Sequence, residues 1–237
     1  MRFRSYLLLA ALSMMFACDN RQKTAELTQA KRVECLDRFC EGDTQPKTTP
    51  GKDVAIKLNG HWYVGPSVYG NPNFGAIAFY WPSKVATGDA EGIVNAKEVV
   101  RSKSGSIENF YDVAIEVFLK SISEAPAERS TYQVLLRLEQ QGNVVEKRSL
   151  RDGLDMWKTR DGNIEEIWYV ATKLSDPTGD RPVVACRGGD TTQSRCTGAF
   201  TWQPGVAASM RFRAANGPDW PEIYIELSRV LALIKKA

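Results

Sequence analysis

The sequence predicts an α+β fold that is mainly antiparallel sheet, with two helices at about residues 130–141 and 219–235. Beyond residue 51, most of the chain consists of short stretches in which apolar and polar residues alternate, which is the period of a half-buried strand. Gly, Pro and Asn turn signals separate these stretches. Helix-start signals stand at two places, each after a series of strands, and this order favours α+β over an alternating α/β chain.

Four strands are predicted before the first helix, at residues 54–58, 61–64, 74–81 and 113–119. Asn59-Gly60 is a tight-turn signal that joins the first two strands as a hairpin. Residues 69–73 contain Gly70 and Pro72 and are predicted to form a loop.

The first helix is predicted from its two ends. Ser130-Thr131-Tyr132-Gln133 has the form of a capping box with Gln133 at the third helical position, and Gly142 is placed to end the helix. The same stretch also alternates in the manner of a strand, but the signals at both ends favour a helix.

Six strands are predicted before the second helix, at residues 144–150, 154–158, 164–172, 182–186, 196–202 and 206–213. Asp219 is predicted to cap the final helix, with Pro221 in its first turn and Glu222 at the third position. One apolar stripe follows at helical spacing, formed by Ile223, Leu227, Val230 and Ile234.

Each half of the chain therefore runs several strands and then one helix. We predict two α+β halves, residues 51–142 and 143–237, after a leader (1–17) and a polar tether (18–50). Two similar halves produced by duplication are one interpretation; chance similarity of short segments is the other.

The N-terminal segment has the features of a bacterial export signal. Arg2 and Arg4 precede an apolar run of signal-peptide length, which is too short to span a bilayer. A small residue before Cys18 predicts a lipoprotein cut with the lipid on Cys18, although plain secretion stays open because the lipobox is imperfect. We expect a periplasmic protein held to a membrane by this lipid. Asp19 favours the inner membrane, with the outer membrane as the alternative.

The cysteine count agrees with export. Five cysteines minus Cys18 leave four, which fall as two local pairs, Cys35 with Cys40 and Cys186 with Cys196. Local pairing costs the least loop entropy, and an oxidising periplasm would preserve both disulfides. A metal site is the alternative, but neither pair has CxxC spacing. We therefore expect no metal.

The charge balance argues against nucleic acid as a partner. The formal net charge is 31 − 28 = +3, and it falls to 29 − 28 = +1 when residues 1–17, which carry two arginines and no acid, are removed. A nearly neutral chain has no electrostatic footprint for nucleic acid. No apolar stretch after Cys18 approaches membrane-spanning length.

The sequence contains no HExxH, GxSxG, P-loop or dinucleotide fingerprint. His61 is the single histidine and could carry a proton, but a structural or merely exposed side chain is the simpler interpretation. Glu165 and Glu166 are adjacent on a predicted strand and would point to opposite faces. We predict no enzyme activity and no cofactor.

Two segments are predicted to contact a partner. Tyr69 and Phe74 flank a Gly/Pro loop, where exposed aromatics serve as protein or sugar contacts. Arg187, Asp190 and Arg195 lie in a polar loop closed at its base by a disulfide, and such a loop loses little entropy on binding. Phe79 and Trp81 are expected in the core.

The C-terminal half resembles a family of bacterial lipoproteins. The likeness covers about residues 113–237 and rests on 169–172, 184–186, Cys196 with the later Trp202-Gln203-Pro204-Gly205, and Asp219-Trp220-Pro221-Glu222-Ile223-Tyr224. These relatives are immunity proteins encoded beside type VI secretion effectors, particularly periplasm-acting lipases and phospholipases. The resemblance implies that the protein binds and blocks one cognate toxin.

Three hypotheses follow. The first is an envelope-anchored immunity protein that neutralises a cognate type VI toxin by binding it. The second is an envelope lipoprotein that binds peptidoglycan or glycans, or assists envelope assembly, through aromatics near Tyr69 and Phe74. The third is a hydrolase that uses His61.

Overall fold

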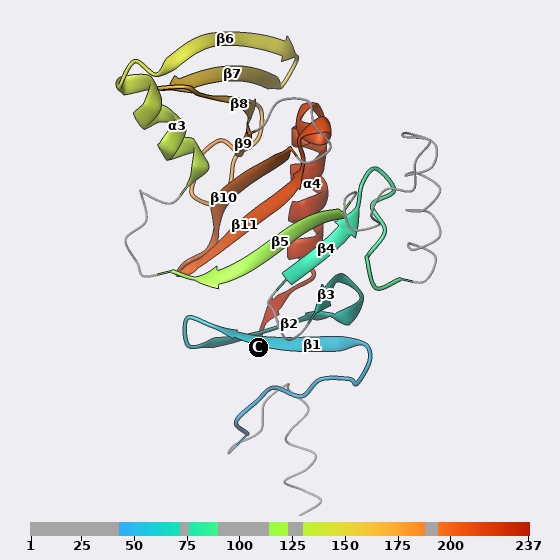
Figure 1. The fold of residues 1–237 in the computed structure, drawn as a ribbon. Helices are drawn as coiled ribbons and strands as arrows, with labels where there is room; N and C mark the ends of the chain where they lie inside the picture. The colour runs from blue at the N-terminus through green and yellow to red at the C-terminus, as the bar shows by residue number, and fades with distance from the viewer. Residues whose placement is uncertain (1–42, 72–75, 90–113, 123–129, 188–193) are drawn as a thin grey trace, which may run out of the picture. The chain divides into compact units, whose positions relative to one another are not determined.

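The structure, a computed structural model, describes residues 43–71, 76–89, 114–122, 130–187 and 194–237. Residues Thr48–Lys236 form one compact unit, and its main element is a nine-stranded antiparallel sheet of order β3-β4-β5-β11-β10-β9-β8-β7-β6 (Figure 1). The strands of this sheet are β3 (Gly70–Asn71), β4 (Ala76–Tyr80), β5 (Ala114–Ser121), β6 (Val144–Arg151), β7 (Leu154–Asp161), β8 (Ile164–Ala171), β9 (Val183–Arg187), β10 (Arg195–Gln203) and β11 (Val206–Arg213).

The strand order shows how the chain builds the sheet. Strands β6 to β11 pair in sequence order as successive hairpins. The last of them, β11, then pairs with β5, so that Met210 lies opposite Val117. Strands from both sides of residue 142 therefore share one sheet, and the predicted α+β class with mainly antiparallel pairing is confirmed.

The first predicted helix forms as α3 (Thr131–Gln140). The Ser130 hydroxyl accepts a hydrogen bond from the Gln133 backbone N–H at 3.3 Å, which is the expected N-cap. Gly142 has a φ of +77°. The N–H groups of Gly142 and Asn143 close the helix by donating to the carbonyls of Glu139 and Leu138, at 2.9 Å each.

The second helix, α4 (Trp220–Leu231), is shorter than predicted. Two tight turns follow it, in which Leu233 N–H and Ile234 N–H donate to the carbonyls of Val230 and Leu231. Lys235–Lys236 then form β12 instead of a further helical turn. The predicted helix was too long because Ile234 continues the apolar spacing of the helix. In the structure, Lys235 and Lys236 instead pair with Val64 and Tyr63 of β2, and strand pairing also satisfies backbone hydrogen-bonding groups.

A separate three-stranded sheet has the order β1-β2-β12. The hairpin of β1 (Asp53–Leu58) and β2 (His61–Pro66) turns at Asn59 and Gly60, with φ values of +46° and +78°. Both values are positive, as an Asn-Gly hairpin turn requires. The predicted loop at 69–73 is wrong in part, because Ser67–Tyr69 form the 3₁₀ turn η1 and Gly70–Asn71 pair with β4 as β3.

The two helices pack on opposite faces of the large sheet (Figure 1). The 3₁₀ segment η3 (Ala214–Asp219) leads into α4, which buries Trp220, Ile223 and Leu227 against the larger cluster. That cluster also contains Phe79 and Trp81, as predicted. On the other face, Leu135 of α3 packs in a second cluster with residues of β7, β8 and β9. Within the described residues, no helix is both long and apolar enough to cross a membrane.

Candidate functional site

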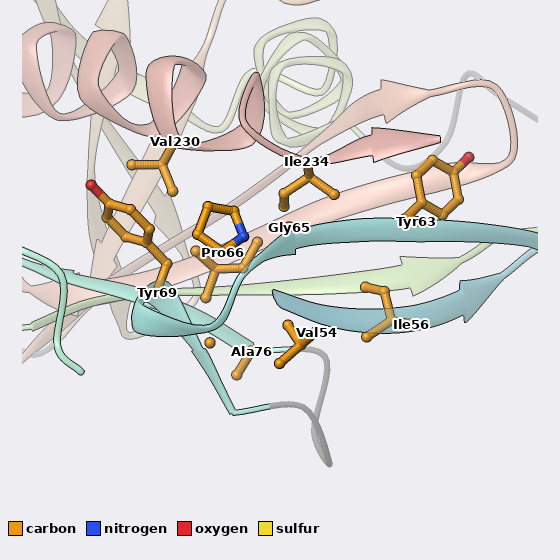
Figure 2. Close-up of a pocket in the computed structure, with 11 residues that line it drawn as sticks. Val54, Ile56, Tyr63, Gly65, Pro66, Tyr69, Ala76, Val230 and Ile234 are labelled. Atoms are coloured by element: carbon orange, nitrogen blue, oxygen red, sulfur yellow. The ribbon is translucent and has the colours of Figure 1, made fainter. Parts of the chain in front are cut away.

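An apolar hollow lies where the small sheet meets the end of α4 (Figure 2). Its lining comes from β1, β2, the η1–β3 turn, β4 and α4 with the turn that follows it: Val54, Ile56, Tyr63, Gly65, Pro66, Tyr69, Gly70, Ala76, Ile77, Val230 and Ile234. The free space is about 30 Å³, whereas a small-molecule site usually needs about 300 Å³ or more. The hollow can therefore accept the tip of a side chain but not a cofactor.

The local sequence explains the shape of the hollow. Val54 and Ile56 are two apart on β1 and so point to the same side of the strand. Gly65 lacks a side chain, and a Cβ at this position would lie 2.9 Å from the Cγ1 atom of Ile234. Figure 2 shows Ile234 over Gly65, with Tyr69 and Val230 at one end of the hollow and Tyr63 at the other.

Tyr69 is held in place by α4. Its hydroxyl accepts a hydrogen bond of 2.9 Å from Nη2 of Arg229, and the Arg229 guanidinium lies 5.9 Å from its ring centre. Arg229 also donates twice to the carboxylate of Glu226, at 2.9 and 2.5 Å. The pKa of Arg229 is raised mainly by its hydrogen bonds with Glu226 and to a smaller extent by the bond with Tyr69, so the guanidinium stays charged.

Exposed apolar side chains stand on the same two elements as Tyr69 and Arg229. Val68 of η1 is 40% exposed and Ile225 of α4 is 55% exposed. Ile225 precedes Arg229 by four residues and so lies next to it on the helix surface. Tyr and Arg beside apolar groups are the residue types that dominate binding energy at protein interfaces.

Arg187 and Arg195 lie on the other face of the large sheet. They are directly paired across β9 and β10, and paired residues of neighbouring strands point to the same face. Cys186 and Cys196, the next residues, form the disulfide predicted from their spacing and belong to the cluster under α4. Since adjacent strand residues point to opposite faces, both arginines point away from α4.

The structure therefore separates the residues that sequence reasoning placed in one interface. Tyr69 belongs to the α4 side of the sheet, and Arg187 and Arg195 belong to the opposite side. Five further predicted residues lie outside the described residues, namely Cys18, Cys35, Cys40, Phe74 and Asp190.

Several residues at these surfaces were not predicted from the sequence. Arg229 and Glu226 were assigned to the helix without a role, although their spacing of three residues is that of a helical ion pair. Arg211 and Arg213 were counted as strand. Their spacing of two, beside Arg195 in the neighbouring strand, was the signal that could have placed all three on one face.

The described residues offer little for catalysis. Among them there is no group of three or more His, Cys, Asp or Glu side chains placed to hold a metal ion. His61 is exposed and lines a hollow of about 470 Å³ beside Gln203 and Lys236. The carboxylate of Glu165 pairs with Lys158 and Arg160, which lowers the pKa of Glu165 and is typical of a surface ion pair.

No protein-family model and no curated protein sequence matches the chain. One solved structure is similar in fold, that of an immunity protein of the Stenotrophomonas maltophilia type IV secretion system. The two chains superpose with a TM-score of 0.51 at 15% sequence identity, over 82% of this chain and 100% of that chain. At this identity the likeness shows a common fold.

Proposed function

We propose that this protein is an immunity protein of the bacterial envelope, which binds one cognate toxin and neutralises it without carrying out a reaction. The observation that supports this most strongly is the fold it shares with the S. maltophilia immunity protein over the whole of that chain. The export signal predicted at residues 1–17 and the Cys186–Cys196 disulfide fit a toxin met in the periplasm.

The class of toxin is a finer part of the proposal. The sequence resemblance favours a type VI lipase or phospholipase, whereas the structural neighbour serves a type IV secretion system. Both comparisons lead to immunity proteins of secretion systems. The identity of the bound toxin shows whether it belongs to a type VI or a type IV secretion system.

A pull-down identifies the toxin. The bait is the protein expressed from its full-length gene with a C-terminal tag, purified from the envelope in mild detergent and mixed with lysate of the source bacterium. We expect one stoichiometric partner whose sequence is that of a secreted toxin, found by mass spectrometry. Recovery of envelope-assembly proteins in its place would contradict the proposal.

Two variants then locate the contact, because Tyr69 and Arg195 lie on opposite faces of the sheet. Tyr69→Ala removes a ring from the α4 side, and Arg195→Gln removes a charge from the other side. Tyr69→Phe is the matched control for the first, since it keeps the ring and loses only the bond to Arg229. The variant that weakens toxin capture identifies the face that binds the toxin.

The glycan-binding alternative gains no support from Tyr69. Its ring packs partly against the core, and its hydroxyl is bound to Arg229, so neither is free as a sugar-stacking platform. Recovery of murein fragments by the same bait, lost with Tyr69→Ala, is the result that would favour this alternative.

A further inference from the structure

A second and larger hollow, which we call the polar hollow, shares Tyr63 with the apolar hollow. Its volume is about 470 Å³, and sites that hold small molecules usually measure about 300–1,000 Å³. Six of its polar lining residues come from β2, β10, β12 and the β1–β2 turn: Asn59, His61, Tyr63, Thr201, Gln203 and Lys236. The polar hollow is therefore large enough for a ligand, whereas the apolar hollow is not.

Strand pairing directs three of these side chains to one side of the small sheet. His61 and Tyr63 are two residues apart on β2, so they point to the same face. Lys236 of β12 is directly opposite Tyr63, and paired residues of neighbouring strands share a face. An imidazole, a phenol and an ammonium group are thus gathered in one place, although β2 and β12 lie far apart in the sequence.

The rim of the polar hollow is fixed by hydrogen bonds between loops and strand ends. The Asn59 N–H donates to the Ser121 hydroxyl at the end of β5 at 2.7 Å, and the Ile122 N–H donates to the Gly205 carbonyl at 2.9 Å. A Cβ at Gly205 would collide with the side-chain amide of Asn59, so the β10–β11 turn requires glycine here. Because these walls are in place before a ligand arrives, less ordering entropy is lost on binding.

The fold itself uses little of this polar lining. Thr178 also lines the hollow, and its hydroxyl is engaged because it donates to Asp176 at 2.7 Å. The six side chains named above, in contrast, make no hydrogen bond or ion pair with any other residue of the chain that the structure describes. Their donors and acceptors are therefore available to a ligand.

Tyr63 is the clearest case among the six. Only 2% of this residue is exposed, and its ring is held against Trp202 with 5.4 Å between the ring centres. Its hydroxyl has no hydrogen-bond partner within the described ranges, and Figure 2 shows it pointing away from the apolar hollow. Since buried hydroxyl groups are normally hydrogen-bonded, this group calls for a partner from outside the fold.

The charge of the lining indicates the kind of ligand. Lys236 brings a positive charge, and no carboxylate stands among the described residues that line the polar hollow. Side-chain amides and hydroxyls add neutral donors, and hydrogen bonds to an ionised acceptor are the stronger kind. One cation with several neutral donors matches a single negative charge. Phosphate carries more charge and is typically bound by arginines or at a helix N-terminus.

We propose that the polar hollow binds a carboxylate, which pairs with Lys236 and accepts hydrogen bonds from Tyr63 and Gln203. Ile122 and Pro204 give the hollow apolar walls for the body of the same ligand. A free organic acid and a carboxylate of the bound toxin share this chemistry. The site is argued from its own lining and does not depend on the proposed function.

The single histidine of the chain, His61, reports on this site by NMR. The full-length protein is grown with ¹³C-labelled histidine and purified from the envelope in mild detergent, with a histidine-free tag that is then cleaved off. N-acetylleucine is the probe, and N-acetylleucinamide is its uncharged match. At fixed pH, we expect the acid to shift the His61 signal to saturation and the amide to bind about tenfold or more weakly. Equal binding of the two, or no shift with either, would overturn the proposal.

Two neighbouring lysines provide matched variants. Lys236→Gln removes the charge at the polar hollow, and Lys235→Gln removes the same charge from a residue that pairs with Val64 and points to the opposite face. We expect the Lys236 variant to bind N-acetylleucine about tenfold or more weakly and the Lys235 variant to stay within about twofold of the wild type. Both lysines are exposed, so both variants should keep the wild-type melting temperature. Equal losses in the two variants would overturn the proposal.

Tyr63→Phe tests the buried hydroxyl, because it keeps the ring against Trp202 and removes only the oxygen. We expect this variant to bind N-acetylleucine about fivefold or more weakly, the loss of one hydrogen bond to a charged acceptor. Wild-type affinity in both Tyr63→Phe and Lys236→Gln would overturn the proposal. So would inorganic phosphate that saturates the His61 shift at a lower concentration than N-acetylleucine.

The toxin pull-down distinguishes the two sources of the carboxylate. If Lys236→Gln loses the toxin and Lys235→Gln retains it, the ligand is a carboxylate of the toxin. If both variants retain the toxin, the ligand is a free acid, and the probe result supports the site in either case. If the wild type captures no toxin while the probe result holds, the proposed function fails and this site stands.

Discussion

Arg229 connects the core of α4 to the surface. Its guanidinium binds Glu226, whose side chain is only 6% exposed, and reaches the hydroxyl of Tyr69. A nearly buried carboxylate without a partner costs several kcal/mol, so the arginine neutralises a charge that α4 would otherwise bury alone. The same group fixes the orientation of Tyr69 at the edge of the apolar hollow.

We expect Arg229→Ala to lower the free energy of unfolding by about 1–2 kcal/mol. This is less than the loss of a fully buried pair, because 49% of the Arg229 side chain is exposed and solvent screens the interaction. Urea unfolding measures the change. Arg148→Ala, a control that removes an exposed pair of 3.5 Å with Glu146, should cost about 0.5 kcal/mol or less. Equal losses in the two variants would show that Glu226 does not depend on Arg229.

The Arg151–Glu222 pair gives folding a dependence on pH. Arg151 of β6 donates at 2.6 and 2.5 Å to the carboxylate of Glu222 in the first turn of α4. This bond holds the pKa of Glu222 below its ordinary value of 4.5. Because the folded pKa is the lower one, the pair stabilises the protein above 4.5, and the contribution is lost as the pH falls through the folded pKa.

We therefore expect Glu222→Gln to lose less stability than the wild type when the pH falls from neutral to below 4.5. Thermal unfolding at a series of pH values measures this, with Glu146→Gln as a control that leaves the Arg151 pair intact. Identical pH profiles for Glu222→Gln and the wild type would mean that the pair adds nothing to stability.

At the scale of elements, α3 is fixed to the sheet by a turn far from it in sequence. The carboxylate of Asp180 accepts hydrogen bonds from the Ser130 hydroxyl at 2.8 Å and from the Gln133 side-chain amide at 2.8 and 3.0 Å. Asp176 in turn holds this turn together by accepting from Thr178 and from the Asp180 N–H. The N-terminus of α3 is thereby placed over β10, where the Thr131 hydroxyl accepts from the Ala199 N–H at 2.7 Å.

We expect Asp180→Ala to destabilise the protein by about 1–2 kcal/mol, since several hydrogen bonds share this carboxylate. In a double-mutant cycle with Gln133→Ala, the two losses should not add, because the residues share one interaction. Asp152→Ala is the control; its partner Lys173 is a surface residue, and the loss should be about 0.5 kcal/mol or less. Additive losses at Asp180 and Gln133 would contradict the shared anchor.

Helix and turn signals in the sequence predicted those elements whose ends depend only on neighbouring residues. Ser130 and Gly142 mark the two ends of α3, and Asn59-Gly60 marks the first hairpin. The partner of the Gln133 side chain is Asp180, 47 residues away, instead of the Ser130 N–H of a capping box. Likewise Asp219 accepts from the indole N–H of Trp81 at 2.9 Å, and its side chain makes no cap. Such hydrogen-bond partners are set by tertiary packing, and the helix propensity of a sequence segment carries no information about them.

At the scale of the whole molecule, the class of fold could be predicted and the arrangement of the surfaces could not. Alternation identified most strands, but it does not tell which strands become neighbours. The pairing of β11 with β5 brings residues about 90 apart together and builds the face on which Arg211 meets Glu116. Tyr69 and Arg195 were grouped in one interface because both flank loops, and sequence distance alone cannot show that a sheet separates them.

The proposed attachment to the envelope depends on one residue. We expect Cys18→Ala to abolish incorporation of labelled palmitate and to release the protein from the membrane fraction, because the acylated cysteine is the proposed anchor. Membrane fractionation and metabolic labelling of the two proteins measure this. Cys186→Ala with Cys196→Ala is the matched control, which removes cysteines without touching the anchor. Retention of the label in the Cys18 variant would contradict a lipid at this position.

A kin competition shows whether the protein protects its own cell from a toxin. A strain without the gene is grown in contact with its wild-type parent, and survivors are counted. We expect the deletion strain to be killed only in contact with the parent, and a plasmid copy of the gene to restore its survival. A parent strain without its secretion apparatus should kill no cells. Equal survival of the deletion strain under contact conditions in which the parent kills an unrelated competitor would contradict the immunity function.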